Sequence, residues 1–321
     1  MRFLIIGAGG IGCYYGIRLQ RRGHKVCYVA RGAHLKAMHR NGLKIHHDSL
    51  NCHEKVDAIN LSTLLQQRNC NDFDLILITL KAGATATTMD QLKLWLADCD
   101  TPVLSLQNGV DNEPLIEQAI GRYRTLGGLA VRIGGHIIAP GEVQVKGPAQ
   151  VILGSWPNHQ SERIFSPDAL TLFAETFNDV GIPTRITPDI RHELWRKLLI
   201  NNGVNPLSAL TRLDTKSLTS DNIYSKTVYR MMQEVAAVSP ADDVHLSQQD
   251  IDEMFELISN FDAIKTSMLV DKEKGRPLEL DGISGAVIKR ATELEIDVPN
   301  TELVHALLMQ DEIAKQPDNR S

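Results

Sequence analysis

The sequence predicts an α/β fold in which an N-terminal domain built on a parallel sheet is followed by an all-helical C-terminal domain. A strand, a glycine-rich turn and a helix open the chain, and apolar strand-like runs continue to residue 187. From residue 188 the strand signals disappear and only helical spacing remains. Because 321 residues suffice for two domains of ordinary size, we expect one domain over 1–187 and a second over 188–321.

The composition is typical of a globular protein and argues against nucleic acid or an anionic membrane as partner. Hydrophobic residues make up 43% of the chain and charged residues 23%. The formal net charge of -5 gives no reason to expect a nucleic acid or an anionic membrane as partner. No apolar run approaches the roughly 20 residues that span a bilayer, and the N-terminus does not resemble a signal peptide. We therefore expect a cytoplasmic protein.

All five cysteines lie in the first third of the chain, without a C-x-x-C pair or a His and Cys cluster at metal-ligand spacing. This pattern predicts reduced thiols and no metal. The cysteines are Cys13, Cys27, Cys52, Cys70 and Cys99.

The first turn carries a dinucleotide-binding pattern. A β-branched and aromatic run, Arg2 to Ile6, leads into the glycine motif and then into a helix over 13–22. In a Rossmann-type fold the first glycine permits the tight turn, the second lets the backbone approach a pyrophosphate, and the third allows close helix–strand packing. The helix N-terminus then offers N–H groups to phosphates, although glycine clusters also form plain turns. The motif consists of Gly7, Ala8, Gly9, Gly10, Ile11 and Gly12.

The end of the second strand indicates which dinucleotide binds. The strand Lys25 to Ala30 is followed by Arg31, where NAD-binding folds usually place an acidic residue for the ribose hydroxyls. A guanidinium group suits a 2′-phosphate through planar, bidentate contacts, so we expect NADP(H) rather than NAD(H). The alternative is that Arg31 is simply solvated.

Two more candidates follow strands of the same sheet. Lys81 comes after the apolar run Phe73 to Thr79, and Asn108 ends the run that begins at Pro102. Because ligands in open α/β sheets bind beyond the carboxyl ends of strands, Lys81 is placed to meet cofactor phosphate or ribose, and Asn108 to meet the nicotinamide ribose and the substrate. Lys81 is nearly as well explained as a surface lysine, and Asn108 as a turn cap.

The remaining elements are expected from spacing and breakers. In the first domain we expect short strands over 43–60, helices over 61–68, 87–97 and 167–180, an antiparallel section over 126–153 added to the sheet's edge, and a strand over 184–187. In the second domain helices are expected over 221–237, 247–272, 281–295 and 300–315, and the polar tail 315–321 should fray.

The helix that opens the second domain carries a polar stripe on an otherwise apolar surface. Its polar residues recur at every fourth position and so share one face of a helix. The surrounding leucines and Trp195 predict that the helix is largely buried and that the stripe lines a cleft. Either a ligand pairs with these groups, or they satisfy one another across a domain interface. Pro206 predicts a kink or an unwound carbonyl. The stripe consists of Glu193, Lys197, Asn201 and Asn205.

A set of motifs spread along nearly the whole chain resembles the ketopantoate reductase (2-dehydropantoate 2-reductase) family. The blocks around Lys197, Ser267 and Glu279 are far more specific than the glycine motif. The resemblance rests on Gly7-Ala-Gly-Gly-Ile-Gly12, Arg31, Thr79-Leu-Lys81, Gln107-Asn108-Gly109, Glu193-Leu-Trp-Arg-Lys197-Leu, Asn201, Asn205-Pro-Leu, Thr266-Ser267-Met268, Glu279-Leu-Asp-Gly282 and Val298-Pro-Asn-Thr301.

The resemblance implies NADPH-dependent reduction of 2-dehydropantoate to (R)-pantoate on the route to pantothenate and coenzyme A. It also implies that Lys197 is the general acid and that Glu279 is a second catalytic acid, which orients Lys197 or binds the substrate hydroxyl and contacts the cofactor site. Substrate binders would be Asn108, Asn201, Asn205 and Ser267. Glu193 pairs with Lys197 or is structural, and no histidine receives a catalytic role.

Three questions stay open at this point. A paralogue with the same polar groups would reduce another branched 2-ketoacid, since nothing in the sequence fixes the substrate's tail. A non-catalytic NADP(H) sensor would bind the cofactor without turnover, although the intact polar set argues against it. The sequence does not decide the oligomeric state, and a homodimer is kept as a candidate.

Overall fold

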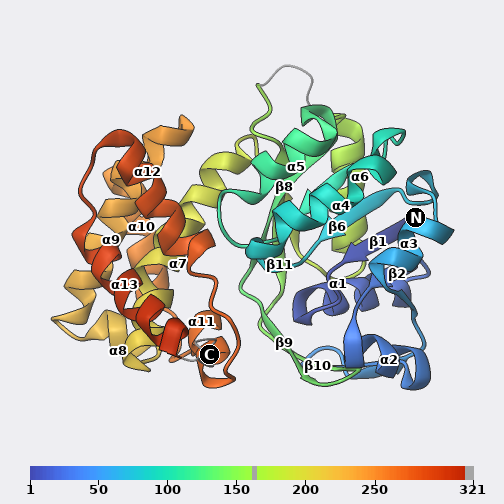
Figure 1. The fold of residues 1–321 in the computed structure, drawn as a ribbon, viewed down its shortest axis with the longest axis horizontal. Helices are drawn as coiled ribbons and strands as arrows, with labels where there is room; N and C mark the ends of the chain where they lie inside the picture. Colours follow the sequence, from blue (N-terminus) through green and yellow to red (C-terminus); the bar gives the residue numbers. More distant parts are fainter. Residues whose placement is uncertain (161–164, 315–321) are drawn as a thin grey trace, which may run out of the picture. The chain divides into compact units, whose positions relative to one another are not determined.

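The computed structural model describes residues 1–160 and 165–314 and divides into two compact units (Figure 1). The first unit holds Met1–Gln107 and Asn112–Arg191. The second holds the chain from His192 onward together with the short segment Asn108–Asp111.

The first unit is organised around a sheet of eight strands in the order β12-β11-β8-β7-β6-β1-β2-β5. The strands from β8 to β5 in this order run parallel to one another, whereas β11 runs antiparallel to β8. This arrangement confirms the predicted Rossmann-type architecture. The bounds are β1 Arg2–Ile6, β2 Lys25–Val29, β5 Asp57–Ile59, β6 Leu75–Ile78, β7 Val103–Ser105, β8 Thr125–Val131, β11 Gln150–Ser155 and β12 Thr184–Ile186.

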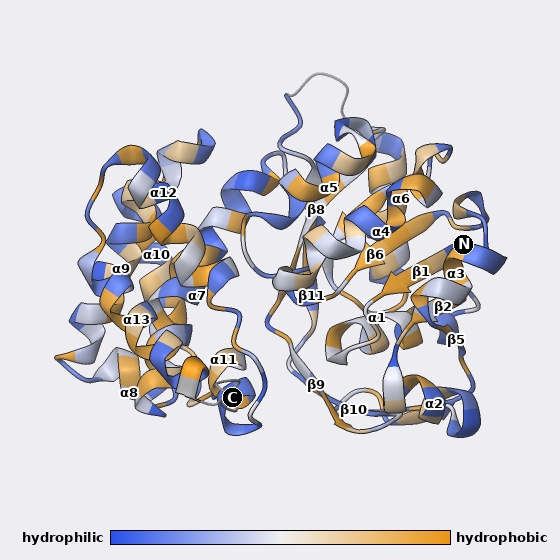
Figure 2. Ribbon diagram, in the orientation of Figure 1, coloured by the Kyte–Doolittle hydropathy of each residue, from blue (hydrophilic) through white to orange (hydrophobic). Residues whose placement is uncertain are grey.

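The central strands are apolar along most of their length and are buried on both faces; β1 is apolar and buried from Phe3 to Ile6. In β1, Phe3 and Ile5 belong to one hydrophobic cluster, whereas Leu4 and Ile6 belong to another. Alternation along the strand thus supplies two cores, one on each side of the sheet, and Figure 2 shows the apolar character of β1 and β6. The helices of this unit are α1 Gly10–Arg21, α2 Gly32–Asn41, α3 Leu61–Gln67, α4 Thr85–Ala97, α5 Asn112–Ile120 and α6 Pro167–Asp179, with short turns η1 Cys70–Asp72, η2 Ala82–Ala84 and η3 Arg122–Arg124.

A second sheet of four strands, in the order β4-β3-β10-β9, corrects part of the prediction for residues 126–153. The expected antiparallel addition to the main sheet exists in β11, which runs antiparallel to the parallel strand β8, but β9 and β10 belong to the second sheet. Instead β10 pairs in parallel with β3, with Val143 opposite Ile45, and both side chains are fully buried. Pairing across about a hundred residues leaves no local signal in the sequence. The strands are β3 Leu43–His46, β4 Cys52–Glu54, β9 Gly134–Ala139 and β10 Glu142–Lys146.

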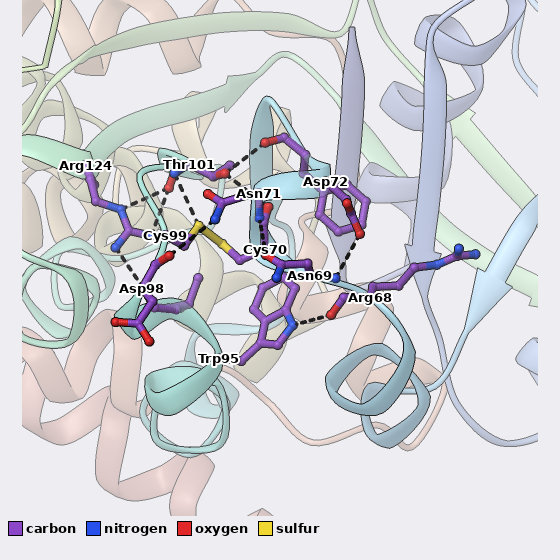
Figure 3. The surroundings of a disulfide bond; sticks show 12 residues. Arg68, Asn69, Cys70, Asn71, Asp72, Trp95, Asp98, Cys99, Thr101 and Arg124 are labelled. Atoms are coloured by element: carbon purple, nitrogen blue, oxygen red, sulfur yellow. Dashed lines mark hydrogen bonds between the residues drawn. A yellow bond between two sulfur atoms is a disulfide. The ribbon is translucent and has the colours of Figure 1, made fainter.

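The expectation of five reduced cysteines is wrong for two of them, because Cys70 and Cys99 form a disulfide (Figure 3). Their Cα atoms lie 5.9 Å apart, within the range that a disulfide spans. The Thr101 hydroxyl donates to the carbonyl oxygens of Cys70 and Phe73, at 3.1 and 2.9 Å, and so holds the two segments together. A separation of 29 residues is not a recognisable motif. Cys13, Cys27 and Cys52 are free thiols.

The described part of the second unit is helical, as predicted, and contains no strand. The expected helix over 247–272 is wrong, because the chain leaves the helix after Ser259 and starts a new one at Ser267, where the Thr266 side chain accepts from the Leu269 N–H at 3.1 Å. The elements are α7 Ile190–Thr211, which begins in the first unit, α8 Thr215–Ser220, α9 Tyr224–Val238, η4 Ser239–Asp242, α10 Gln248–Ser259, α11 Ser267–Glu273, the π-helical turn η5 Asp281–Gly285, α12 Ala286–Leu294 and α13 Pro299–Ala314.

Pro206 does not end the first helix of this unit. The helix α7 continues through Pro206 to Thr211, and its apolar residues Leu194, Trp195 and Leu198 are at most 2% exposed. The described helices include none long and apolar enough to cross a membrane. The tail over 315–321, expected to fray, lies outside the described residues.

Candidate active site

Three of the predicted cofactor-binding groups follow neighbouring parallel strands. The glycine turn Gly7–Gly12 follows β1, Arg31 follows β2, and Lys81 follows β6. Because β2, β1 and β6 are adjacent and parallel, these groups leave the sheet at the same edge. The chain runs outward from β1 to β2 on one side and returns to β6 on the other. The edge is therefore the switch point at which open α/β sheets bind nucleotides.

The glycine turn is packed tightly against the end of β6. Gly7 has a φ of +108°, which only glycine adopts without strain, and a Cβ there would lie 2.8 Å from the Leu80 nitrogen. A Cβ on Gly12 would lie 2.4 Å from the carbonyl oxygen of Gly7. The Thr79 hydroxyl donates to that same oxygen at 2.7 Å. Two of the three motif glycines are thus required by the packing of the turn itself.

The start of α1 has the features of an anion-binding site. Gly9 is the N-cap residue, no side chain caps the helix, and the first turn contains no acidic residue. A Cβ on Gly9 would meet no atom within 4 Å, so the backbone here is open to a ligand. The first N–H groups of a helix have no acceptor within the helix, and the positive end of the helix dipole lies beside them. This end of α1 therefore fits the pyrophosphate of a dinucleotide.

The two basic candidates lie at the surface of the first unit. Arg31 is the exposed N-cap residue of α2, and no hydrogen bond or ion pair links its side chain to another of the described residues. Its guanidinium is therefore available to a ligand. Lys81 is exposed and immediately precedes the short turn η2.

The helix α7 carries the predicted stripe in the second unit. Lys197 is half-buried, whereas Asn201 and Asn205 are only 9% and 6% exposed. Asn205 donates from Nδ2 to Oδ1 of Asn201 across 3.4 Å, which orients both amides along one face of the helix. Asn201 and Asn205 lie one and two turns after Lys197, so the structure brings these three predicted residues together on one element.

The neighbouring Asn202 has a structural role. It is fully buried and donates from Nδ2 to the hydroxyl of Thr301 at 3.0 Å. Both Thr301 and Asn300 donate to the buried carboxylate of Glu234, at distances between 2.6 and 2.9 Å. The Val298–Thr301 motif therefore anchors the start of α13 to α9 and α7. Its role in the structure is packing rather than chemistry.

Ser267 and Glu279 come from other parts of the helical unit. Ser267 is exposed at the first position of α11, and Glu279 is half-buried in the loop before η5. The π-helical turn that follows Glu279 is held by Ser284, whose hydroxyl lies 2.8 Å from Nδ1 of His305. Burial lowers the pKa of His305 and so favours its neutral form, although Asp281 opposes this shift. Such single-turn π-bulges frequently accompany functional sites.

The segment that carries Asn108 is anchored to the second unit. Asn108 is half-buried, and Gly109 turns the chain with a φ of +97°. Asp111, at the other end of the segment, accepts a hydrogen bond from Nη2 of Arg290 at 2.8 Å. The segment thus belongs to the second unit, which also carries Lys197 and Glu279, and is bound there by α12.

Sequence reasoning missed Arg290. Its side chain is almost fully buried, with Asp111 and Asp242 both within 2.8 Å of the same nitrogen. Burial alone would lower the pKa of Arg290, but the hydrogen bonds and charges of the two carboxylates raise it above its usual value. An arginine in an otherwise amphipathic helix carries no signal of such an environment, because its partners are distant in the sequence.

Comparison with known proteins places this geometry in a family. The model of "Ketopantoate reductase PanE/ApbA" matches residues 3–158, and that of "Ketopantoate reductase PanE/ApbA C terminal" matches residues 189–312. The chain belongs to the ketopantoate reductase family. The resemblance read from the motifs is thereby confirmed, and the chain is an oxidoreductase of this family.

Relatives of the family align over nearly full length. A 2-dehydropantoate 2-reductase of Mesorhizobium japonicum is 30% identical over 96% of this chain and 97% of its own. The PanE/ApbA family ketopantoate reductase from Ralstonia eutropha JMP134 superposes with a TM-score of 0.85 at 27% identity, over 99% of this chain and 100% of that one. D-mandelate dehydrogenase with NADH has the same fold, with a TM-score of 0.84 at 21% identity, over 98% of this chain and 99% of that one. The individual site residues remain predictions.

Proposed function

We propose that this ketopantoate reductase family member reduces 2-dehydropantoate to (R)-pantoate with NADPH as the hydride donor and Lys197 as the general acid. The observation that carries the proposal is the polar face of α7, on which a half-buried lysine precedes two buried, mutually hydrogen-bonded amides. Buried amides with capacity to spare are suited to a small polar ligand.

Lys197 supplies the proton in this mechanism. A lysine ammonium group polarises the ketone oxygen and donates a proton to it as the alkoxide forms. Its position in the middle of α7, between the buried Trp195 and Leu198, limits the freedom of its backbone and so holds the donor in place. Glu279 is the residue proposed to orient this ammonium group or to accept a hydrogen bond from the substrate hydroxyl.

Amides and a hydroxyl hold the substrate. Asn201 and Asn205 present neutral donors and acceptors that suit the carboxylate and hydroxyl of a small ketoacid. Ser267, exposed at the start of α11, contributes a hydroxyl, and Asn108 is the proposed contact with both the nicotinamide ribose and the substrate. Neutral groups bind such a substrate without competing with Lys197 for the proton.

The dinucleotide is proposed to be NADP(H), which when bound supplies the hydride from its nicotinamide ring. The open start of α1 beside Gly9 supports a pyrophosphate site. The exposed Arg31 at the end of β2 supports a 2′-phosphate contact, because guanidinium groups bind phosphates in bidentate fashion. Lys81 is proposed to add a second positive charge toward the phosphate or ribose. The cytoplasmic location and the homodimer stay predictions.

The deciding experiment is an NADPH-oxidation assay with the purified full-length protein. Ketopantoate is compared with a panel of other branched 2-ketoacids, and each is repeated with NADH. We expect the highest kcat/KM with ketopantoate and NADPH. Equal turnover across the panel would point to a paralogous reductase. Tight NADPH binding without turnover of any 2-ketoacid would instead point to a cofactor-sensing regulator and overturn the proposal.

A further inference from the structure

The short segment Asn108–Asp111 is held at both of its flanks by one buried threonine. The Thr85 hydroxyl, which is fully buried, accepts from Nε2 of Gln107 at 2.8 Å and donates to Oδ1 of Asn112 at 2.8 Å. Gln107 and Asn112 are themselves at most 2% exposed. The two ends are therefore fixed in the first unit, while the four residues between them pack with the second.

Arg290 is a rigid anchor for this segment. Its Nη1 donates to the carbonyl oxygen of Ala286 at 3.1 Å within α12, and its Nη2 donates to Asp242 at 2.6 Å. The guanidinium also lies over the ring of Trp195, with its central carbon 5.3 Å from the ring centroid. These three contacts are additional to the hydrogen bond with Asp111, so the guanidinium is held at several points.

Arg290 contacts elements that carry, or lie close in sequence to, three proposed site residues. Trp195, under the guanidinium, lies two residues before Lys197 on α7. Asp111 lies three residues after Asn108, and α12 itself follows directly on η5, which begins two residues after Glu279. The Arg290 side chain is 5% exposed, whereas the carboxylates of Asp111 and Asp242 are 39% and 24% exposed. A buried guanidinium that is held by several contacts has little freedom to move, so it restricts the positions of the elements that bind it.

We propose that Arg290 is a positioning residue that, through Asp111, sets the place of Asn108 relative to Lys197. The inference rests on the proposed function, since it assigns Asn108 a contact with the reactants. Arg290 itself touches none of the reacting atoms. Its second partner, Asp242, lies in η4, outside the segment Asn108–Asp111, so it provides a matched control within the same ion-pair cluster.

The first test is amide hydrogen exchange of the full-length protein, which needs no activity. Asp111→Asn keeps the size of the side chain but removes the charge that binds Arg290. We expect faster exchange in the peptide covering residues 106–112, whereas Asp242→Asn, which leaves the pair between Asp111 and Arg290 intact, should change that peptide much less. Unchanged exchange in Asp111→Asn, or equal exchange in both variants, overturns the inference. Replacing Arg290 directly would leave two carboxylates without a partner and could unfold the unit, so the single carboxylate variants are preferred.

The second test is a double-mutant cycle on kcat with the best 2-ketoacid substrate and NADPH. Asp111→Asn should lower kcat roughly tenfold, as expected for a displaced reactant contact, with a much smaller effect in Asp242→Asn. In an Asn108→Ala background the same Asp111 substitution should change kcat less than about twofold, because its effect passes through Asn108. If the effects of the Asp111 and Asn108 substitutions on kcat are additive while the wild-type enzyme is active, the positioning role is overturned and the proposed function stands. A wild-type protein inactive on every 2-ketoacid overturns the proposed function, and the inference about Asn108 with it.

Discussion

The backbone of Gly10 lies directly against that of Gly135, so that a Cβ on Gly10 would come within 2.0 Å of the Gly135 carbonyl carbon. The edge strand β9 of the small sheet thus packs on the first turn of α1. Gly9, one residue earlier, faces open space and has a φ of -85°, which any residue adopts. Two adjacent glycines of one motif therefore differ: Gly10 is required by packing, whereas Gly9 has open space beside it.

The first prediction follows from this difference. Gly10→Ala should lower the free energy of unfolding of the first unit by about 1–3 kcal/mol, because the added methyl group must displace the β9 backbone. Gly9→Ala should leave the thermal midpoint close to that of the wild type but raise the KM for NADPH, because the methyl group enters the space beside the helix N-terminus. Thermal unfolding and steady-state kinetics of both variants measure the two effects. A Gly9→Ala variant that binds NADPH normally would contradict the pyrophosphate site.

The second prediction concerns the proposed general acid. Lys197→Ala should lower kcat by roughly 10²- to 10⁴-fold while the dissociation constant for NADPH barely changes, because only the transition state loses its proton donor. The adjacent Arg196 is a matched control, since it forms ion pairs with Asp250 and Glu253. Arg196→Ala should reduce stability and leave kcat within a few fold of the wild type. A near-normal kcat in Lys197→Ala would falsify the general-acid role.

The parts of the fold that follow from local patterns could be predicted. The strands β1 and β6 contain continuous runs of four apolar residues, and α7 combines helical spacing with a polar stripe, so each is visible in a short window of sequence. The break at Thr266 was missed because a single capping threonine was hidden within a helical pattern on both sides. The pairing of β10 with β3 was missed for another reason, since partners a hundred residues apart leave no trace in either segment.

The residues of the candidate site also differ in whether the sequence alone reveals them. Lys197, Asn201 and Asn205 could be found because they share one helix, and the glycine motif because its spacing is fixed by the turn. Arg290 could not be found, because its environment depends on three residues distant in the sequence, Asp111, Asp242 and Trp195, meeting around its side chain. The disulfide between Cys70 and Cys99 likewise depends on two loops that tertiary structure brings together.

The third prediction tests cofactor preference. Arg31→Ala should raise the KM for NADPH roughly ten- to a hundredfold and the KM for NADH by much less, because only NADPH carries the 2′-phosphate that the guanidinium is proposed to bind. Arg40, exposed in the last turn of the same helix, serves as the control of equal charge. Arg40→Ala should affect both cofactors equally and weakly. Equal losses for NADPH and NADH in Arg31→Ala would remove the argument for a 2′-phosphate contact.

The fourth prediction concerns the disulfide that closes the chain between η1 and the segment after α4. Replacing Cys70 and Cys99 by serine should lower the free energy of unfolding by about 3–4 kcal/mol in the chain-entropy model, since the bond spans 29 residues. The expected fall in the thermal midpoint is on the order of 10 °C. A reducing agent should produce the same fall in the wild type but not in the doubly substituted protein. Cys52→Ser, which removes a free thiol, is the control and should keep the response to reductant.

Loss of this disulfide should not affect catalysis, because the bond lies at the opposite end of the strands from the candidate site. Cys70 precedes β6 and Cys99 precedes β7, so the bond lies at the amino ends of these strands, whereas Lys81 and the glycine turn lie at the carboxyl edge of the same sheet. Because the central strands between the two ends are fully buried and rigidly paired, loss of the bond should not displace the cofactor groups. We therefore expect kcat and the KM for NADPH to stay within about twofold of the wild type at temperatures well below unfolding. A large loss of activity in the folded, reduced protein would show that the amino and carboxyl ends of β6 and β7 are coupled, and would contradict a purely stabilising role.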